Sequence, residues 1–107
     1  MYNINMNKNS NELSIGIVAN SENEKAIKIK DELEQKLISR KINVKIYDGD
    51  IDQEESLDIF SSAVSVIFAI GGDGTLLSIL RSCGQENVPI IGINAGRKGF
   101  LAEISSD

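Results

Sequence analysis

Apolar residues recur along the chain in short runs, separated by stretches of mixed polarity. Runs that are nearly continuous, or that alternate with polar residues, are typical of strands packed in a sheet. Four such runs predict strands, at residues 13–19, 42–46, 64–70 and 88–94. Pro89 lies near the start of the last run, where a missing backbone donor is tolerated.

Helical periodicity occupies the intervals between these strands. Ser21 followed by Glu24 resembles a capping box, and the apolar residues after it recur at three- and four-residue spacing. Shorter helical patterns cover residues 57–63 and 76–83, and Gly84 is placed as the residue that ends the last of them.

Strands that alternate with helices predict an α/β fold, in which βαβ crossovers build a parallel sheet covered on both faces. We expect this domain to span residues 13–107, after a disordered polar arm at residues 1–12. Ligands of such sheets bind at the carboxyl ends of the strands. The two glycine-rich turns, at residues 71–75 and 94–99, fall at that edge.

The amino-acid composition limits the kinds of catalysis and binding that this chain can perform. The 107 residues carry a net charge of −5 without a basic stripe, so a nucleic-acid partner is not expected. The absence of histidine excludes Ser-His-Asp and Cys-His catalysis and His-ligated zinc. No apolar run is long enough for a membrane span, and the single cysteine, Cys83, is expected to be buried in a protein of the reducing cytoplasm. The groups left for chemistry are carboxylates, hydroxyls, cationic side chains and the backbone amides of glycine-rich turns. This set suits phosphate and nucleotide chemistry.

The sequence Gly71-Gly72-Asp73-Gly74-Thr75 follows the strongest predicted strand. An Asp-Gly pair is also a hairpin signal, but the residues that follow have helical rather than strand periodicity. We therefore favour a phosphate site. The glycines would adopt positive φ and let backbone amides approach phosphate oxygens, beside the positive end of a helix. Asp73 could then take a proton from a hydroxyl or help hold a metal ion, and Thr75 could cap the helix or bind phosphate.

Other ligand motifs do not match. A P-loop is absent, and the dinucleotide Gly-x-Gly-x-x-Gly pattern would need glycine where Leu77 stands. An EF-hand beginning at Asp48 would need glycine and glutamate where Gln53 and Ile59 stand, so the acidic stretch 48–55 is interpreted as a solvated loop.

The second glycine-rich turn runs from Asn94 into Phe100. Alone it is an ordinary turn after a strand. Beside the first turn, Arg97 and Lys98 would bring positive charge to the site, Asn94 could bond a base or ribose, and Phe100 could pack against adenine.

The stretch VIFAIGGDGTLLSILR, followed by IIGINAGRKGFLAEI, resembles the N-terminal domain of the NAD kinases. The resemblance implies a Rossmann-like domain of an enzyme that phosphorylates the adenosine ribose 2′-hydroxyl of NAD, with ATP or polyphosphate as donor and Mg²⁺ or another divalent metal accompanying ATP. GGDGT alone is shared with phosphofructokinases and with lipid and diacylglycerol kinases. The second block favours NAD kinase.

The resemblance also implies roles for single residues. Asp73 corresponds to the catalytic aspartate that accepts the 2′-hydroxyl proton. Contacts to phosphate or NAD are implied for Gly72, Gly74, Thr75, Leu77, Asn94 and Phe100. No protein residue is assigned as a metal ligand.

The family has a second, β-rich domain, and this chain ends at Asp107 before it. We therefore expect the first domain of an NAD kinase, a homo-oligomer when complete, and leave open whether a chain of this length is active. The alternatives are a lipid-kinase-like or phosphofructokinase-like domain, or a nucleotide-binding module without catalysis.

Overall fold

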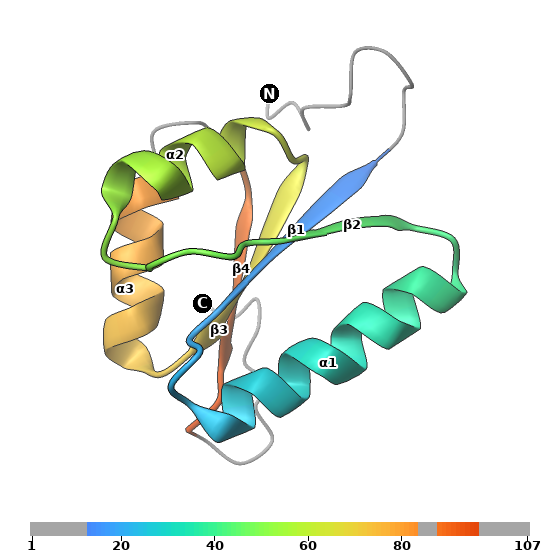
Figure 1. The fold of residues 1–107 in the computed structure, drawn as a ribbon, viewed down its shortest axis with the longest axis horizontal. Coiled ribbons are helices and arrows are strands. Elements are labelled where there is room, and N and C mark those ends of the chain that lie inside the picture. Colours follow the sequence, from blue (N-terminus) through green and yellow to red (C-terminus); the bar gives the residue numbers. More distant parts are fainter. Residues whose placement is uncertain (1–12, 84–87, 97–107) are drawn as a thin grey trace.

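The computed structural model describes residues 13–83 and 88–96 (Figure 1). Strands and helices alternate throughout this part of the chain. Their bounds are β1 Ser14–Ala19, α1 Glu24–Ser39, β2 Asn43–Ile46, α2 Glu54–Ser62, β3 Val66–Gly71, α3 Asp73–Cys83 and β4 Ile90–Asn94. The arm at residues 1–12, the helix-ending Gly84 and the segment 97–107 lie outside the described residues.

Within the described residues the strands form one four-stranded sheet in the order β2-β1-β3-β4, and every neighbouring pair is parallel. The α/β fold is therefore confirmed. The expected strands begin up to two residues too early, and α2 begins at Glu54 rather than near Leu57. Val64 and Val88 are buried just before β3 and β4, so the apolar runs extend beyond these strands. Helix α2 begins with the polar residues Glu54 and Glu55, which an apolar pattern does not mark.

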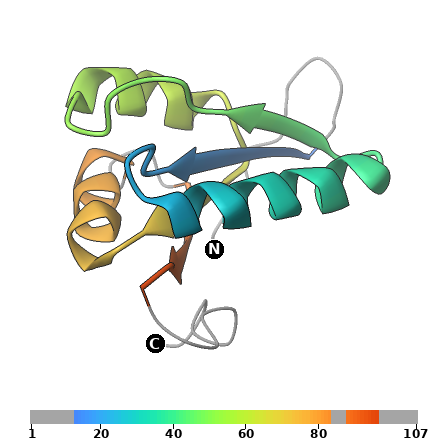
Figure 2. The ribbon, with the colours of Figure 1, turned by 60° about the horizontal axis from the view of Figure 1, so that its bottom comes forward.

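Helices cover both faces of the sheet, with α1 on one face and α2 and α3 on the other (Figures 1 and 2). On the α1 face, Ile17, Ile70 and Ile93 belong to one buried cluster with Ala26 and Ile29 of the helix. The opposite cluster joins strand residues to Leu57, Ile79 and Cys83 of α2 and α3. Burial on both faces explains why β1 and β3 are nearly continuous apolar runs. Cys83 is fully buried, as expected.

The two ends of α1 are set by side-chain and backbone hydrogen bonds. The predicted Ser21–Glu24 capping box is wrong, because the helix begins two residues later and Asn23 is its N-cap, with its side-chain oxygen accepting from the amide of Ala26 at 3.0 Å. At the other end, Lys41 adopts a positive φ of 62°. The amides of Lys41 and Ile42 donate back to carbonyls of the last turn, the arrangement of a Schellman motif.

The arrangement of the helices creates a topological switch point between β1 and β3. These neighbouring strands send α1 and α3 to opposite faces of the sheet, so the loops that follow them diverge from one another (Figure 1). Crevices at such points are where open parallel sheets bind ligands. No helix in the described part of the chain is long and apolar enough to cross a bilayer.

Candidate functional site

Asp73 and Asn94 lie together at the carboxyl edge of the sheet. Asp73 is the first residue of α3, and Asn94 is the last residue of β4. Nδ2 of Asn94 donates a hydrogen bond of 2.5 Å to Oδ1 of Asp73, while Oδ1 of Asn94 accepts from the amide of Gly96 at 2.9 Å. The amide of Ala95 donates to the carbonyl of Gly71 at 2.9 Å, so β4 stays paired to β3 up to this point. Asp73 is exposed and accessible to a ligand.

The three glycines of the first turn have different surroundings. A Cβ on Gly71 would lie 2.8 Å from Cβ of Thr75 and 2.7 Å from its Cγ2. Side-chain atoms on Gly72 or Gly74 would meet nothing within 4 Å. None of the three adopts positive φ, so the prediction that the turn needs that conformation is wrong. Gly71 is required by close packing, whereas Gly72 and Gly74 leave open space beside the helix.

The beginning of α3 supplies positive potential at this turn. The carbonyl of Gly72 accepts from the amide of Leu76 at 3.0 Å, which closes the first helical turn. The backbone N–H groups of a first turn carry the positive end of the helix dipole and favour an anion. Asp73, Gly74 and Thr75 belong to that turn, so a bound phosphate would meet backbone amides and a hydroxyl together.

Asn20 joins the loop after β1 to the same turn. Its Nδ2 donates to Oγ1 of Thr75 at 3.1 Å, and its backbone amide donates to the carbonyl of Ile70 at 3.0 Å. Asn20 is not among the site residues predicted from the sequence. The available signal was its position: it directly follows a buried strand, as Asp73 nearly does, and carboxyl ends of parallel strands share one edge.

A pocket of about 670 Å³ opens beside Asn20 and Thr75. It is lined by the loop after β1 (Asn20, Ser21, Glu22), by residues 49–52 after β2, and by Gly74, Thr75 and Ser78 of α3. Asp73 and Asn94 are not among the described residues that line it. The acidic stretch interpreted as a solvated loop therefore forms one wall of a polar pocket.

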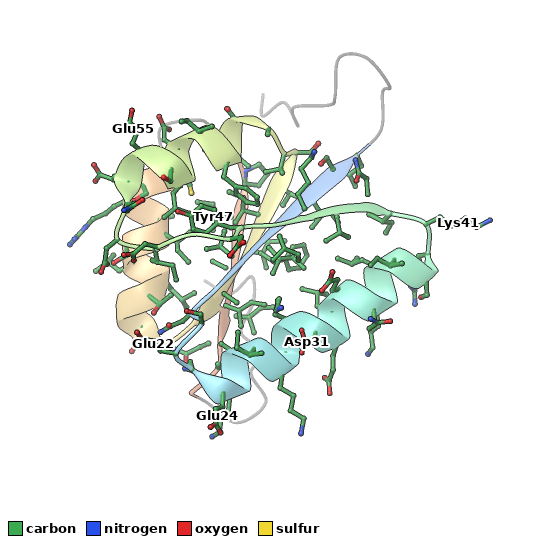
Figure 3. All side chains as sticks on the ribbon, viewed as in Figure 1. Glu22, Glu24, Asp31, Lys41, Tyr47 and Glu55 are labelled. Atoms are coloured by element: carbon green, nitrogen blue, oxygen red, sulfur yellow. The ribbon has the colours of Figure 1, made fainter. Side chains whose placement is uncertain are left out.

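Tyr47 holds this acidic wall in place. Its hydroxyl donates to the carbonyl of Asp50 at 2.8 Å, and its ring packs edge-on against Phe60 with centroids 5.3 Å apart. Figure 3 labels Tyr47 beside the loop that leads from β2 to α2. Burial raises the pKa of the Tyr47 phenol above its ordinary value of 10.0, and the negative charge of Asp50 acts in the same direction.

Of the remaining predicted site residues, the structure describes only Leu77. Leu77 is 50% exposed on α3, one turn beyond Asp73. Phe100, Arg97 and Lys98 lie outside the described residues. Among the residues described, no three carboxylate or cysteine side chains gather as ligands for a metal ion.

Comparison with known proteins identifies the family. Residues 51–107 match the family model of the ATP-NAD kinase N-terminal domain. The chain belongs to the NAD kinase family. It is 37% identical over 93 residues to the NAD kinase of Caldicellulosiruptor saccharolyticus, covering 87% of this chain and 33% of that protein. It is 31% identical over 101 residues to the NAD kinase of Methanosphaera stadtmanae, covering 89% and 36%.

A third relative is the bifunctional NADP phosphatase/NAD kinase of Methanocaldococcus jannaschii, 38% identical over 96 residues that cover 89% of this chain and 17% of that protein. The chain thus spans about a third or less of the length of these NAD kinase relatives. The described fold agrees with an N-terminal NAD kinase domain.

Proposed function

We propose that this chain provides the phosphate-binding and proton-accepting part of an NAD kinase, which transfers phosphate from ATP to the adenosine ribose 2′-hydroxyl of NAD. The observation that carries the proposal is the exposed carboxylate of Asp73, placed at the beginning of α3 and held by Asn94. A carboxylate beside a phosphate-binding helix end can accept a hydroxyl proton within reach of a phosphoryl group.

In this mechanism Asp73 accepts the proton of the 2′-hydroxyl while that oxygen attacks the γ-phosphorus of ATP. A new O–P bond forms, the bond between the γ-phosphorus and the bridging oxygen breaks, and ADP leaves. First-turn amides of α3 stabilise charge on the equatorial oxygens. Mg²⁺ belongs to the ATP substrate and supplies charge neutralisation when bound. Asn94 keeps the carboxylate of Asp73 in one orientation.

Contacts to nucleotide are proposed for Gly72, Gly74, Thr75, Leu77, Asn94 and Phe100. Open space at Gly72 and Gly74 and the partly exposed Leu77 support these assignments. Phe100 rests on the family motif alone. The buried Cys83 fits a protein of the reducing cytoplasm. Assembly into homo-oligomers stays a prediction.

The substitution Asp73→Asn tests the proposal, with NADP formation from NAD and Mg·ATP as the measurement. Removing a general base is expected to lower turnover about 10²–10⁴-fold. Asp31→Asn, on α1 outside the site, is the matched control and should leave turnover unchanged. Normal turnover of Asp73→Asn would remove the proposed role.

The alternative candidate is a nucleotide-binding module without catalysis. It predicts that the purified chain binds NAD or ATP but forms no NADP. Parallel assays with diacylglycerol and fructose 6-phosphate would distinguish the kinase classes that share GGDGT.

A further inference from the structure

We infer that Asn20 is a positioning residue for Asp73. Asn20 holds the first turn of α3 from the side of β1, as Asn94 holds it from the side of β4, so that the carboxylate of Asp73 keeps one direction. The inference rests on the proposed kinase function, because this direction matters for catalysis only if Asp73 accepts the hydroxyl proton.

Asn20 and Asn94 make the same pair of side-chain contacts. In each asparagine, Oδ1 accepts a hydrogen bond from the backbone amide two residues later, at 3.0 Å for Asn20 and 2.9 Å for Asn94. The remaining side-chain atom, Nδ2, is then a donor, and it faces the first turn of α3. Nδ2 of Asn20 donates to Oγ1 of Thr75 at 3.1 Å, and Nδ2 of Asn94 donates to the carboxylate of Asp73.

The two asparagines reach α3 from opposite sides. In the sheet, β1 and β4 are the neighbours of β3, the strand that leads into α3. Asn20 directly follows β1, where its backbone amide donates to the carbonyl of Ile70 at 3.0 Å, and Asn94 is the last residue of β4. Both asparagines are therefore anchored to the sheet, and they hold the beginning of the helix at residues 73 and 75.

The backbone beside Asp73 needs this support from outside the turn. Gly72 and Gly74 stand on either side of Asp73, and a Cβ on either glycine would meet nothing within 4 Å. Packing of side chains therefore does not confine these two positions, and glycine has more backbone freedom than any other residue. The bond from Asn94 holds the Asp73 side chain, whereas the bond from Asn20 holds the turn from which that side chain projects.

Thr75 can pass this restraint on to Asp73. It lies in the same helical turn, and it packs so closely against Gly71 that a Cβ on Gly71 would lie 2.8 Å from Cβ of Thr75. The Thr75 side chain is therefore confined while it accepts the bond from Asn20. Loss of this bond would release the turn on the side of β1 and give the carboxylate of Asp73 more freedom of direction.

Proton–nitrogen correlation NMR of the purified protein tests the inference without requiring turnover. The reporter is the side-chain amide signal of Asn94, which senses the position of the carboxylate that it bonds. Asn20→Ala is expected to shift this signal. It should also speed hydrogen exchange of the Leu76 amide, which closes the first turn, about two- to tenfold, the usual effect of one hydrogen bond. Asn23→Ala, in the same loop, is the matched control and should shift neither signal.

The substitution Thr75→Val keeps the shape of the side chain and removes its hydroxyl. It should reproduce the shift of the Asn94 signal that Asn20→Ala causes. If Asn20 acts through Thr75, the double variant Asn20→Ala/Thr75→Val shifts the signal no further than Thr75→Val alone. Unchanged Asn94 and Leu76 signals in Asn20→Ala, or equal changes in the Asn23→Ala control, would overturn the inference.

Steady-state formation of NADP separates this inference from the kinase proposal. Asn20→Ala is expected to lower kcat about two- to tenfold and to leave the KM for NAD within about twofold, because a poorly directed base affects the transition state and not the binding of the ribose. Normal kcat in Asn20→Ala, together with an inactive Asp73→Asn variant, would overturn the inference and leave the kinase proposal intact. Wild-type protein without turnover would instead contradict the proposed activity of this chain, and the NMR signals would still decide whether Asn20 holds the turn.

Discussion

Asn94 donates from Nδ2 to Oδ1 of Asp73 over 2.5 Å, and this bond links the last residue of β4 to the first residue of α3. The same asparagine accepts from Gly96 through Oδ1, so its amide orientation is determined. A side chain fixed at both atoms can hold the Asp73 carboxylate in one direction, which is what a positioned proton acceptor requires.

Asn94→Ala is therefore expected to lower NADP formation about tenfold, because the carboxylate of Asp73 gains rotational freedom. Steady-state kinetics with NAD and Mg·ATP measure this effect. Asn43→Ala, at an exposed position of β2, is the control and should behave as wild type. Kinetics of Asn94→Ala equal to those of the control would show that the hydrogen bond has no part in catalysis.

Substitutions at two glycines of the first turn are expected to have different effects, one on stability and the other on ligand binding. Gly71→Ala forces a Cβ against Thr75 and should lower the free energy of unfolding by about 1–3 kcal/mol. Gly72→Ala meets no protein atom and should change it by less than about 1 kcal/mol, yet weaken nucleotide binding by filling the open space. Urea unfolding and calorimetric titration measure the two effects. Similar loss of stability in both variants would contradict this division.

Part of this site was predictable, because the strand pattern and the glycine-rich motif both place it at the carboxyl ends of the strands. The parallel sheet places residues that follow neighbouring strands at one edge, so Asp73 and Asn94 could be expected to lie close together. The side chains that cross between loops were not predictable. Asn20 reaches Thr75 from 55 positions away, and no spacing rule encodes such a contact.

The error at the start of α1 has a different, local origin. Ser21, Asn23 and Glu24 all suit a helix N-terminus, and the capping-box spacing favoured Ser21. Oδ1 of Asn20 instead accepts from the amide of Glu22, and the chain turns before the helix begins. The amide of Asn23 also donates to the carbonyl of Asn20, so a turn closed by two local bonds precedes the helix and leaves Asn23 as its N-cap.

Asn23→Ala is expected to lower the free energy of unfolding by about 1 kcal/mol, because the amide of Ala26 loses its capping partner. Ser21→Ala is the matched comparison and should change stability by less than about 0.5 kcal/mol, since Ser21 is exposed and does not cap the helix. Chemical unfolding of both variants measures the difference. A larger loss for Ser21→Ala would restore the capping box.

Tyr47 predicts a dependence of stability on alkaline pH. Because burial raises its pKa, the folded protein keeps the phenol proton after the unfolded chain has lost it. The contribution of Tyr47 is therefore constant below pH 10, and the free energy of unfolding falls as the pH rises above that value. In a Tyr2→Phe background Tyr47 is the only tyrosine, so its absorbance titration should have a midpoint above 10.0. Adding Tyr47→Phe should remove this part of the pH dependence, and a midpoint at or below 10.0 would refute the assignment.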